Sequence, residues 1–169
     1  LWGGPWYLPQ RDKYEHVEHS HGVQRHDEFV ELSAAASTAT ARERLTWLDA
    51  DDEPLARQRI RRLLEDLPGY RVCGEATDGH DTLHKIAELE PDILLLDIRM
   101  PGMDGMQAAG QISQLDSPPA VIFCTAYEEH ALQAFRVHAV DYLLKPVGAQ
   151  DLKRALDKAR ALNRVQIAE

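Results

Sequence analysis

From residue 45 onward, short apolar runs alternate with longer segments in which apolar residues recur every three or four positions. The short runs have the length of β-strands, and the longer segments have the period of amphipathic helices. Strict alternation of the two is typical of a parallel sheet built from βαβ crossovers. The pattern predicts strands at 45–50, 70–76, 92–97, 120–125 and 140–144, and helices at 54–67, 79–89, 104–115, 128–138 and 149–162.

Two of these segments indicate the fold class. The first helix begins at Pro54, where a missing N–H is harmless, and its period assigns one face to the core, formed by Leu55, Ile60, Leu63, Leu64 and Leu67. The run ILLL at 93–96 shows no polar alternation, as expected for a central strand covered on both faces. The sequence therefore predicts a doubly wound α/β domain with a parallel five-stranded sheet.

Residues 1–44 lack a sustained apolar period and are predicted to form an irregular arm and linker, with one short helix around 26–36. Four of the eight His lie here, at positions 16, 19, 21 and 26. Their spacing does not reproduce the i, i+4 pair of metal-binding helices, and no Cys is nearby. A solvated arm is favoured over a metal site.

Composition narrows the classes of function. The formal net charge is -9, which argues against a nucleic-acid-binding surface, because such a surface needs clustered Lys and Arg. The group Arg57, Arg59, Arg61 and Arg62 is interpreted as a solvated helix face. Neither a long apolar run nor a signal peptide is found, so a cytoplasmic protein without membrane contact is expected. Cys73 and Cys124 are expected to be buried, reduced thiols.

Polar residues follow the predicted strands at the edge where doubly wound sheets place their sites. Asp51 and Asp52 follow the first strand, Asp97 the third, Thr125 ends the fourth and Lys145 follows the fifth. Three carboxylates placed close together repel one another and need a cation, and a set of oxygen ligands suits Mg²⁺. Taken alone, Asp51 or Asp52 is more often a cap of the helix at Pro54 than a metal ligand.

Four segments carry a resemblance to a known family: DDEPLAR (51–57), LLLDIRMPGMDG (94–105), VIFCTA (121–126) and DYLLKPV (141–147). In order and spacing they resemble the receiver domain of two-component response regulators, and HALQAFRVHAVDYLLKP (130–146) is similar to the LytTR-type subfamily. The resemblance covers about 45–162. It implies a flavodoxin-like (βα)₅ domain with strand order 2-1-3-4-5. Residues 163–169 then begin a linker to a C-terminal DNA-binding output domain that is absent from this chain.

The resemblance also implies a role for each site residue. Asp97 is the phosphoacceptor and takes a phosphoryl group from a histidine kinase. Asp52, Asp97 and the backbone carbonyl of Arg99 hold Mg²⁺ or Mn²⁺, with Asp51 acting largely through metal-bound water. Thr125 and Lys145 contact phosphoryl oxygens, and Pro146 corresponds to the family's cis-proline, which directs the Lys side chain.

Further residues are implied in switching and in signal lifetime. Movement of Thr125 toward the phosphoryl group lets Tyr142 rotate inward, which changes the face formed by the fourth helix, the fifth strand and the fifth helix, a possible homodimer face. Arg99 and Tyr127 lie beside the approach of the hydrolytic water and are predicted to slow dephosphorylation.

One position departs from the family pattern. Asp49, two residues before Asp51, occupies a strand position that normally holds an aliphatic residue. Its carboxylate is either partly exposed, neutralised by a raised pKa, or paired with a cation.

Two other functions stay open beside the phosphorylated switch. One is a pseudo-receiver that only mediates protein contact. The other, which is less well supported, is a hydrolase that acts on a small phosphorylated substrate. Such an enzyme needs a second carboxylate at the position where this chain has Arg99.

Overall fold

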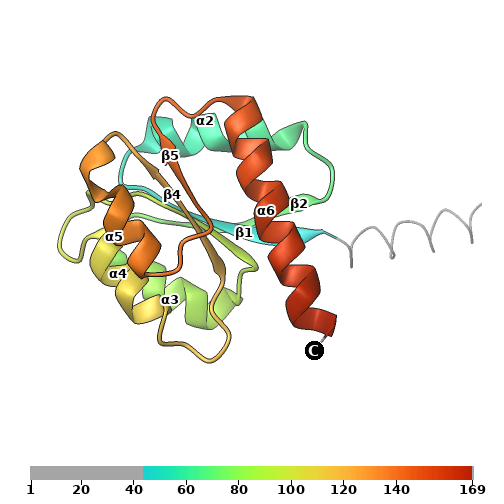
Figure 1. Cartoon of the computed structure of the whole chain (residues 1–169). Coiled ribbons are helices and arrows are strands. Elements are labelled where there is room, and N and C mark those ends of the chain that lie inside the picture. Colours follow the sequence, from blue (N-terminus) through green and yellow to red (C-terminus); the bar gives the residue numbers. More distant parts are fainter. Residues whose placement is uncertain (1–43, 169) are drawn as a thin grey trace, which may run out of the picture. The chain divides into compact units, whose positions relative to one another are not determined.

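The computed structural model describes residues 44–168, which form a five-stranded parallel sheet with helices on both faces (Figure 1). The strands run in the order β2-β1-β3-β4-β5. Their bounds are β1 Leu45–Ala50, β2 Tyr70–Ala76, β3 Ile93–Leu96, β4 Ala120–Thr125 and β5 Asp141–Leu144. The helices are α2 Pro54–Glu65, α3 Gly79–Leu89, α4 Gly105–Ile112, α5 Ala131–Arg136 and α6 Ala149–Ala168, with a short 3₁₀ helix at Glu128–His130. The predicted fold class and strand order are confirmed.

Two apolar clusters fill the spaces between the sheet and its helical layers. Helices α2 and α6 pack on one face of the sheet, and α3, α4 and α5 pack on the other (Figure 1). Every residue of β3 is buried, which is why the run ILLL carries no polar alternation. The β1 side chains alternate between the faces, so that Trp47 packs toward α2 and α6 while Leu48 packs toward the opposite layer.

Local sequence signals explain where several helices begin. Asp78 caps α3, accepting a hydrogen bond from the backbone N–H of Asp81 at 2.8 Å. Asp104 and Gln107 form a reciprocal capping box at the start of α4. Helix α2 has Pro54 in its first turn, whereas Glu53 at the N-cap position makes no capping hydrogen bond with its side chain.

The loop after β3 requires two glycines. Gly102 has a φ of +72°, a left-handed conformation that side chains disfavour. Gly105 donates its N–H to the carbonyl of Ile98 at 2.7 Å. A Cβ atom at Gly105 would lie 1.9 Å from the backbone oxygen of Asp97. The segment MPGMDG therefore folds back tightly onto the end of β3 and fixes the backbone that carries Asp97.

The structure corrects four details of the predicted elements. Leu55 was assigned to the buried face of α2 but is 77% exposed, because it lies in the first turn, before the part of the helix that packs into the core. The helix predicted at 128–138 is broken into a 3₁₀ turn and α5, and it ends before His138, whose φ is +60°. Helices α2 and α4 end two and three residues early. Helix α6 continues past 162 to Ala168, through a segment without Gly or Pro.

The predicted arm and short helix of residues 1–43 lie outside the described residues, as do the four His between 16 and 26. Among the residues that the structure describes, no helix combines the length and the hydrophobicity needed to span a membrane.

Candidate functional site at the carboxyl edge of the sheet

Two buried carboxylates lie side by side at the ends of neighbouring strands. Asp51 follows β1 and is 5% exposed, and Asp97 follows β3 and is 4% exposed. The N–H of Asp97 donates to the carbonyl of Ala50 at 2.8 Å, which holds the two strand ends together. Asp97 Oδ1 accepts the N–H of Ile98 at 2.7 Å. One oxygen of Asp97 is thus held by the backbone, and Oδ2 lies beside a cation.

That cation is the ammonium group of Lys145, which enters from the loop after β5. Its Nζ lies 2.8 Å from Asp51 Oδ2, 3.1 Å from Asp97 Oδ2 and 3.7 Å from Glu53 Oε1. The backbone N–H of Lys145 donates to the carbonyl of Thr125 at 2.8 Å, and the Lys145–Pro146 peptide bond is cis. The structure therefore brings together the side chains of Asp51, Asp97 and Lys145, although 94 positions separate Asp51 from Lys145 in the sequence.

The pKa values in this group reflect burial and close charges. Burial raises the pKa of Asp97 and the Asp51 charge adds to this effect, while Lys145 opposes it. Burial alone lowers the pKa of Lys145, but its hydrogen bond with Asp51 and the charge of Asp97 outweigh burial, and the net pKa is raised. Lys145 is therefore a permanent ammonium near neutral pH.

An acidic group suited to a cation lies at the same edge. Asp51, Asp52, Glu53 and Asp97 each offer a carboxylate oxygen, and these oxygens all lie within 4.8 Å of one another. An all-oxygen set of this charge fits Mg²⁺ or Mn²⁺ rather than a soft metal. Glu53 was missed by the sequence reasoning, although it continues the acidic run DDE. The backbone carbonyl of Arg99 as a metal ligand stays a prediction.

Thr125 ends β4 and Tyr142 lies in the neighbouring strand β5, and their role as a switch pair stays a prediction. Thr125 is fully buried, and its Oγ1 has no hydrogen-bond partner within the described part of the chain. The Tyr142 ring is partly buried, with its centroid 6.0 Å from that of Phe123, and its hydroxyl donates to the backbone carbonyl of Tyr127. Tyr142 thus already lies against the core and links β5 to the loop that follows β4.

Arg99 and Tyr127 contact each other in the loops that follow β3 and β4. The guanidinium carbon of Arg99 lies 3.5 Å from the centroid of the Tyr127 ring, and Arg99 Nη2 lies 3.6 Å from Glu129 Oε1. Stacking of a guanidinium on an aromatic face is favourable. The two residues therefore form one unit, a contact that sequence reasoning did not foresee.

Asp49 is buried and carries a raised pKa, which decides among the three alternatives for this position. Only 3% of the residue is exposed, and its Oδ2 has no hydrogen-bond partner among residues 44–168. Burial raises the pKa of Asp49 to about 7, and the charges of Asp51 and Glu75 add to the effect. Arg57 and Lys145 lower it by their charge, but neither forms an ion pair with Asp49.

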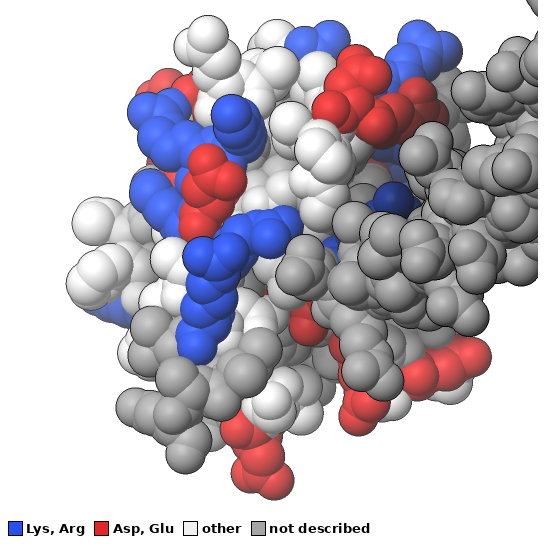
Figure 2. All heavy atoms as spheres, turned by 90° about the vertical axis from the view of Figure 1, so that its right-hand side faces the viewer, with Lys and Arg blue, Asp and Glu red and all other residues white. Residues whose placement is uncertain are grey.

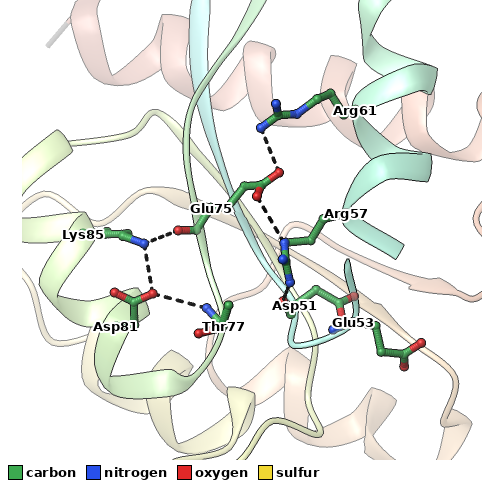
Figure 3. Close-up of polar contacts among 8 residues, drawn as sticks. All are labelled: Asp51, Glu53, Arg57, Arg61, Glu75, Thr77, Asp81 and Lys85. Carbon is green, nitrogen blue, oxygen red and sulfur yellow. Dashed lines mark hydrogen bonds and ion pairs between the residues drawn. The ribbon is translucent and has the colours of Figure 1, made fainter. Parts of the chain in front are cut away.

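Arg57 is not the solvated residue that the sequence predicts. Its Nη1 donates to the backbone carbonyl of Asp51 at 2.7 Å and its Nε to Glu75 Oε2 at 3.3 Å (Figure 3). Arg61 also contacts Glu75, at 2.8 Å. Because this network joins α2 to β2 and to the backbone of Asp51, it helps to fix the carboxylate at the end of β1.

The other arginines of α2 fit the predicted solvated face. Arg59, Arg61 and Arg62 are exposed. On the face of the molecule shown in Figure 2, acidic side chains lie among the Lys and Arg side chains. This mixed distribution is typical of a solvated surface.

Comparison with known proteins agrees with this geometry. The family model of the response regulator receiver domain matches residues 48–157, well over half of the chain. The chain is 57% identical over 122 residues to the positive alginate biosynthesis regulatory protein of Pseudomonas aeruginosa, covering 72% of this chain and 49% of that protein. It is 38% identical over 111 residues to the transcriptional regulatory protein LytR of Staphylococcus aureus, covering 66% and 45%.

The chain thus spans about half the length of these curated relatives. They confirm the predicted resemblance to the LytTR-type subfamily, because a LytR regulator and the alginate biosynthesis regulator are among them.

Solved structures give the same assignment. The receiver domain of the response regulator NarL from Mycobacterium tuberculosis superposes with a TM-score of 0.65 at 36% identity, covering 70% of this chain and 98% of that one. The response regulatory domain of mrkE from Klebsiella pneumoniae gives a TM-score of 0.63 at 31% identity, covering 74% and 100%. The fold, the acidic edge and the matched sequence agree, and the chain belongs to the response regulator receiver domain family.

Proposed function

We propose that this chain is a phosphoryl-accepting signalling switch in which Asp97 is the phosphoacceptor. Phosphorylation by a kinase is the general function of the family to which the chain belongs. The assignment of Asp97 rests on the position of its Oδ2 atom, which lies beside Lys145 and within the acidic group. Phosphoryl transfer needs positive charge close to the transferring group, and a carboxylate surrounded only by neutral donors does not have it.

The chemistry follows from the position of each side chain. An oxygen of Asp97 attacks the phosphorus of a phosphohistidine in line, the P–N bond breaks, and its electron pair leaves with the imidazole. The product is an acyl phosphate on Asp97. Lys145, already 3.1 Å from Asp97, pairs with one phosphoryl oxygen, and the unpartnered hydroxyl of Thr125 donates to another.

We assign the cation site to the acidic group at the same edge, with Asp51, Asp52 and Asp97 as ligands and Glu53 within reach. When bound there, Mg²⁺ or Mn²⁺ neutralises the carboxylates and the charge on the transferring group. The backbone carbonyl of Arg99 completes the predicted ligand set. The chain catalyses its own phosphorylation and dephosphorylation only, and it acts as a signalling domain.

The proposed switch joins Thr125 to Tyr142. When Thr125 moves toward the phosphoryl group, the partly buried Tyr142 ring follows and α5, β5 and α6 change position. Leu132 and Phe135 on α5 are 82% and 83% exposed, and Leu144 on β5 is 41% exposed. Exposed apolar side chains of this size support a contact with a second copy on this face.

The domain limits and partners belong to the same proposal. We propose an arm at 1–44, the receiver domain at 45–162, and, at 163–169, the start of a linker to a DNA-binding output domain; the first residues of this linker continue α6 as far as Ala168. The matched relatives, one of them a transcriptional regulatory protein, are about twice as long as the matched region. The kinase partner is a sensor histidine kinase, and the location is cytoplasmic.

Phosphorylation by a small donor tests the proposal. The full 169-residue chain is incubated with acetyl phosphate and Mg²⁺, and intact mass is measured. We expect the wild type to gain one phosphoryl group and Asp97→Asn to gain none while its circular dichroism spectrum is unchanged. Asp92→Asn, which changes the carboxylate at the other end of β3, is the matched control and should be phosphorylated normally.

The result also separates the other functions. A wild type that gains no mass from acetyl phosphate or from any histidine kinase supports the pseudo-receiver. Normal phosphorylation of Asp97→Asn contradicts the assignment of the acceptor. The hydrolase alternative lacks support, because the position two residues after Asp97 holds Arg99, which stacks on Tyr127.

A further inference from the structure

A cavity of about 440 Å³ extends from the phosphorylation site toward the layer of α2 and α6. It shares Asp51, Asp97 and Lys145 with that site. The rest of its lining comes from β1, β3, β4, the first two turns of α2 and the segment that follows β5. A volume of this size accommodates a small organic molecule.

Asp49 lines this cavity, and the proposed phosphoryl transfer gives this residue no role. The residue is 3% exposed, and its Oδ2 lacks a hydrogen-bond partner in the described part of the chain. Asp49 is not a member of the acidic group that offers oxygens to a metal. A buried carboxylate without a partner is costly, and an occupant that supplies a donor removes the cost.

The charges around the cavity favour a cationic occupant. Four carboxylates line it, those of Asp49, Asp51, Glu53 and Asp97, against the cations of Lys145 and Arg59. Lys145 is held by the other three carboxylates, and Arg59 donates to the carbonyl of Val147 at 3.1 Å. Neither of these two cations forms an ion pair with Asp49.

The walls favour an organic cation over a metal ion. Apolar groups dominate the lining around Asp49, with Ile60, Leu95, Cys124, Pro146 and Val147 among them. A hard metal ion needs six or more oxygen ligands, whereas Asp49 has apolar neighbours and lies outside the group of carboxylates that could hold a metal. An ammonium or guanidinium group carried on a short apolar body satisfies the carboxylate and the walls together.

We propose that this cavity binds a small organic cation, with the Asp49 carboxylate as its counter-ion and the apolar side chains around it holding the body of the ligand. The binding goes beyond the proposed function, because it requires no phosphoryl group. Its test therefore stands or falls independently of phosphorylation.

Benzylamine serves as the probe, and benzyl alcohol is its neutral counterpart of nearly equal shape. Each is titrated into the ¹⁵N-labelled full chain without added metal, and the amide signals of Leu95, Cys124 and Val147 are followed by NMR. We expect saturable shifts with benzylamine. Benzyl alcohol and the Asp49→Asn variant should each bind about tenfold more weakly or worse, because a charge-assisted hydrogen bond is lost.

Two control variants locate the binding. Glu75→Gln changes the carboxylate that pairs in register with Asp49 on β2 but does not line the cavity, and it should leave the affinity within about twofold, as expected for a charge effect at a distance. Asp52→Asn changes a carboxylate that belongs to the acidic group but does not line the cavity, and it should weaken binding less than Asp49→Asn does.

Three outcomes overturn the proposal. Benzylamine that binds Asp49→Asn as tightly as wild type does not use this carboxylate. Affinity lost in Asp52→Asn but kept in Asp49→Asn assigns the amine to the acidic group instead. Equal affinities for benzylamine and benzyl alcohol show an apolar cavity with no preference for a cation.

Discussion

Two aspartates bracket strand β3, and their surroundings differ in kind. Asp92, just before the strand, accepts the N–H of Thr46 at 2.8 Å, the Thr46 hydroxyl at 3.1 Å and the Asn163 amide at 3.4 Å. Asp97, just after it, is held by one backbone N–H and shares the ammonium of Lys145 with Asp51. The first carboxylate is satisfied by neutral donors, whereas the second depends on a charge that several groups share.

The same contrast extends along the two edges of the sheet. At the carboxyl edge, Thr125 Oγ1 and Asp49 Oδ2 are buried without partners in the region that the structure describes. Unsatisfied buried groups lower stability and tend to occur where a site must bind something. We conclude that the side of the sheet at the amino ends of the strands is arranged for stability, and the side at their carboxyl ends for binding.

Removal of divalent cations should have the largest effect. In excess EDTA we expect phosphorylation by acetyl phosphate to be lost, because the acidic group then has no cation to balance it during transfer. Readdition of Mg²⁺ should restore the rate and, by binding the folded state, raise the melting temperature. Undiminished phosphorylation in EDTA would remove the cation from the mechanism.

Loss of Lys145 should come next. Lys145→Met removes the cation that contacts three carboxylates, and the phosphorylation rate should fall by about 10²-fold, as for the loss of one transition-state donor. Asn163→Ala, which removes a donor to Asp92 at the other edge, is the matched variant. If the two substitutions lowered the phosphorylation rate equally, the proposed difference between the two ends of the strands would be wrong.

Stability should respond in opposite directions at the two edges. Asp49→Val removes an unpartnered buried carboxylate and should raise the free energy of unfolding by about 1–3 kcal/mol. Asp92→Ala leaves the Thr46 N–H without its partner and should lower it by about 1 kcal/mol. Urea denaturation of the full chain measures both, and a loss of stability in Asp49→Val would mean that this carboxylate is satisfied.

The gain from Asp49→Val should also depend on pH. The pKa of this carboxyl is raised by folding from the ordinary 3.8 to about 7. Between these values the unfolded chain ionises first, so the wild type loses stability as pH rises. The difference between Asp49→Val and wild type should be smallest near pH 4 and level off above pH 7. A difference that shrinks as pH rises would show the opposite sign of the pKa shift.

The smallest effect concerns the lifetime of the acyl phosphate. Arg99 and Tyr127 stack on each other, and we predict that together they crowd the approach of water without acting as a base. The double variant Arg99→Asn/Tyr127→Glu should lose its phosphoryl group several-fold faster than wild type, measured as decay of the phosphorylated mass. An unchanged or slower decay would refute crowding, and Asp92→Asn provides the unaffected reference.

The sequence by itself determined the order of the elements and the fold class, and it placed five polar residues, at positions 51, 52, 97, 125 and 145, at the carboxyl ends of strands. These features depend on local signals: apolar periodicity, the run ILLL before Asp97, and glycines at 102 and 105 where the loop folds back. Such signals act over a few residues, so they can be interpreted without knowing which segments meet.

Only the tertiary structure decided what surrounds those residues. The burial of Asp49, the exposure of Leu55, the contact of Arg99 with Tyr127 and the role of Arg57 beside Asp51 each depend on segments that are distant in the chain. A charge is exposed, paired or neutralised according to its neighbours in space. For Asp49 the sequence left three states open, and packing between the sheet and the α2 and α6 layer selected the buried one with a raised pKa.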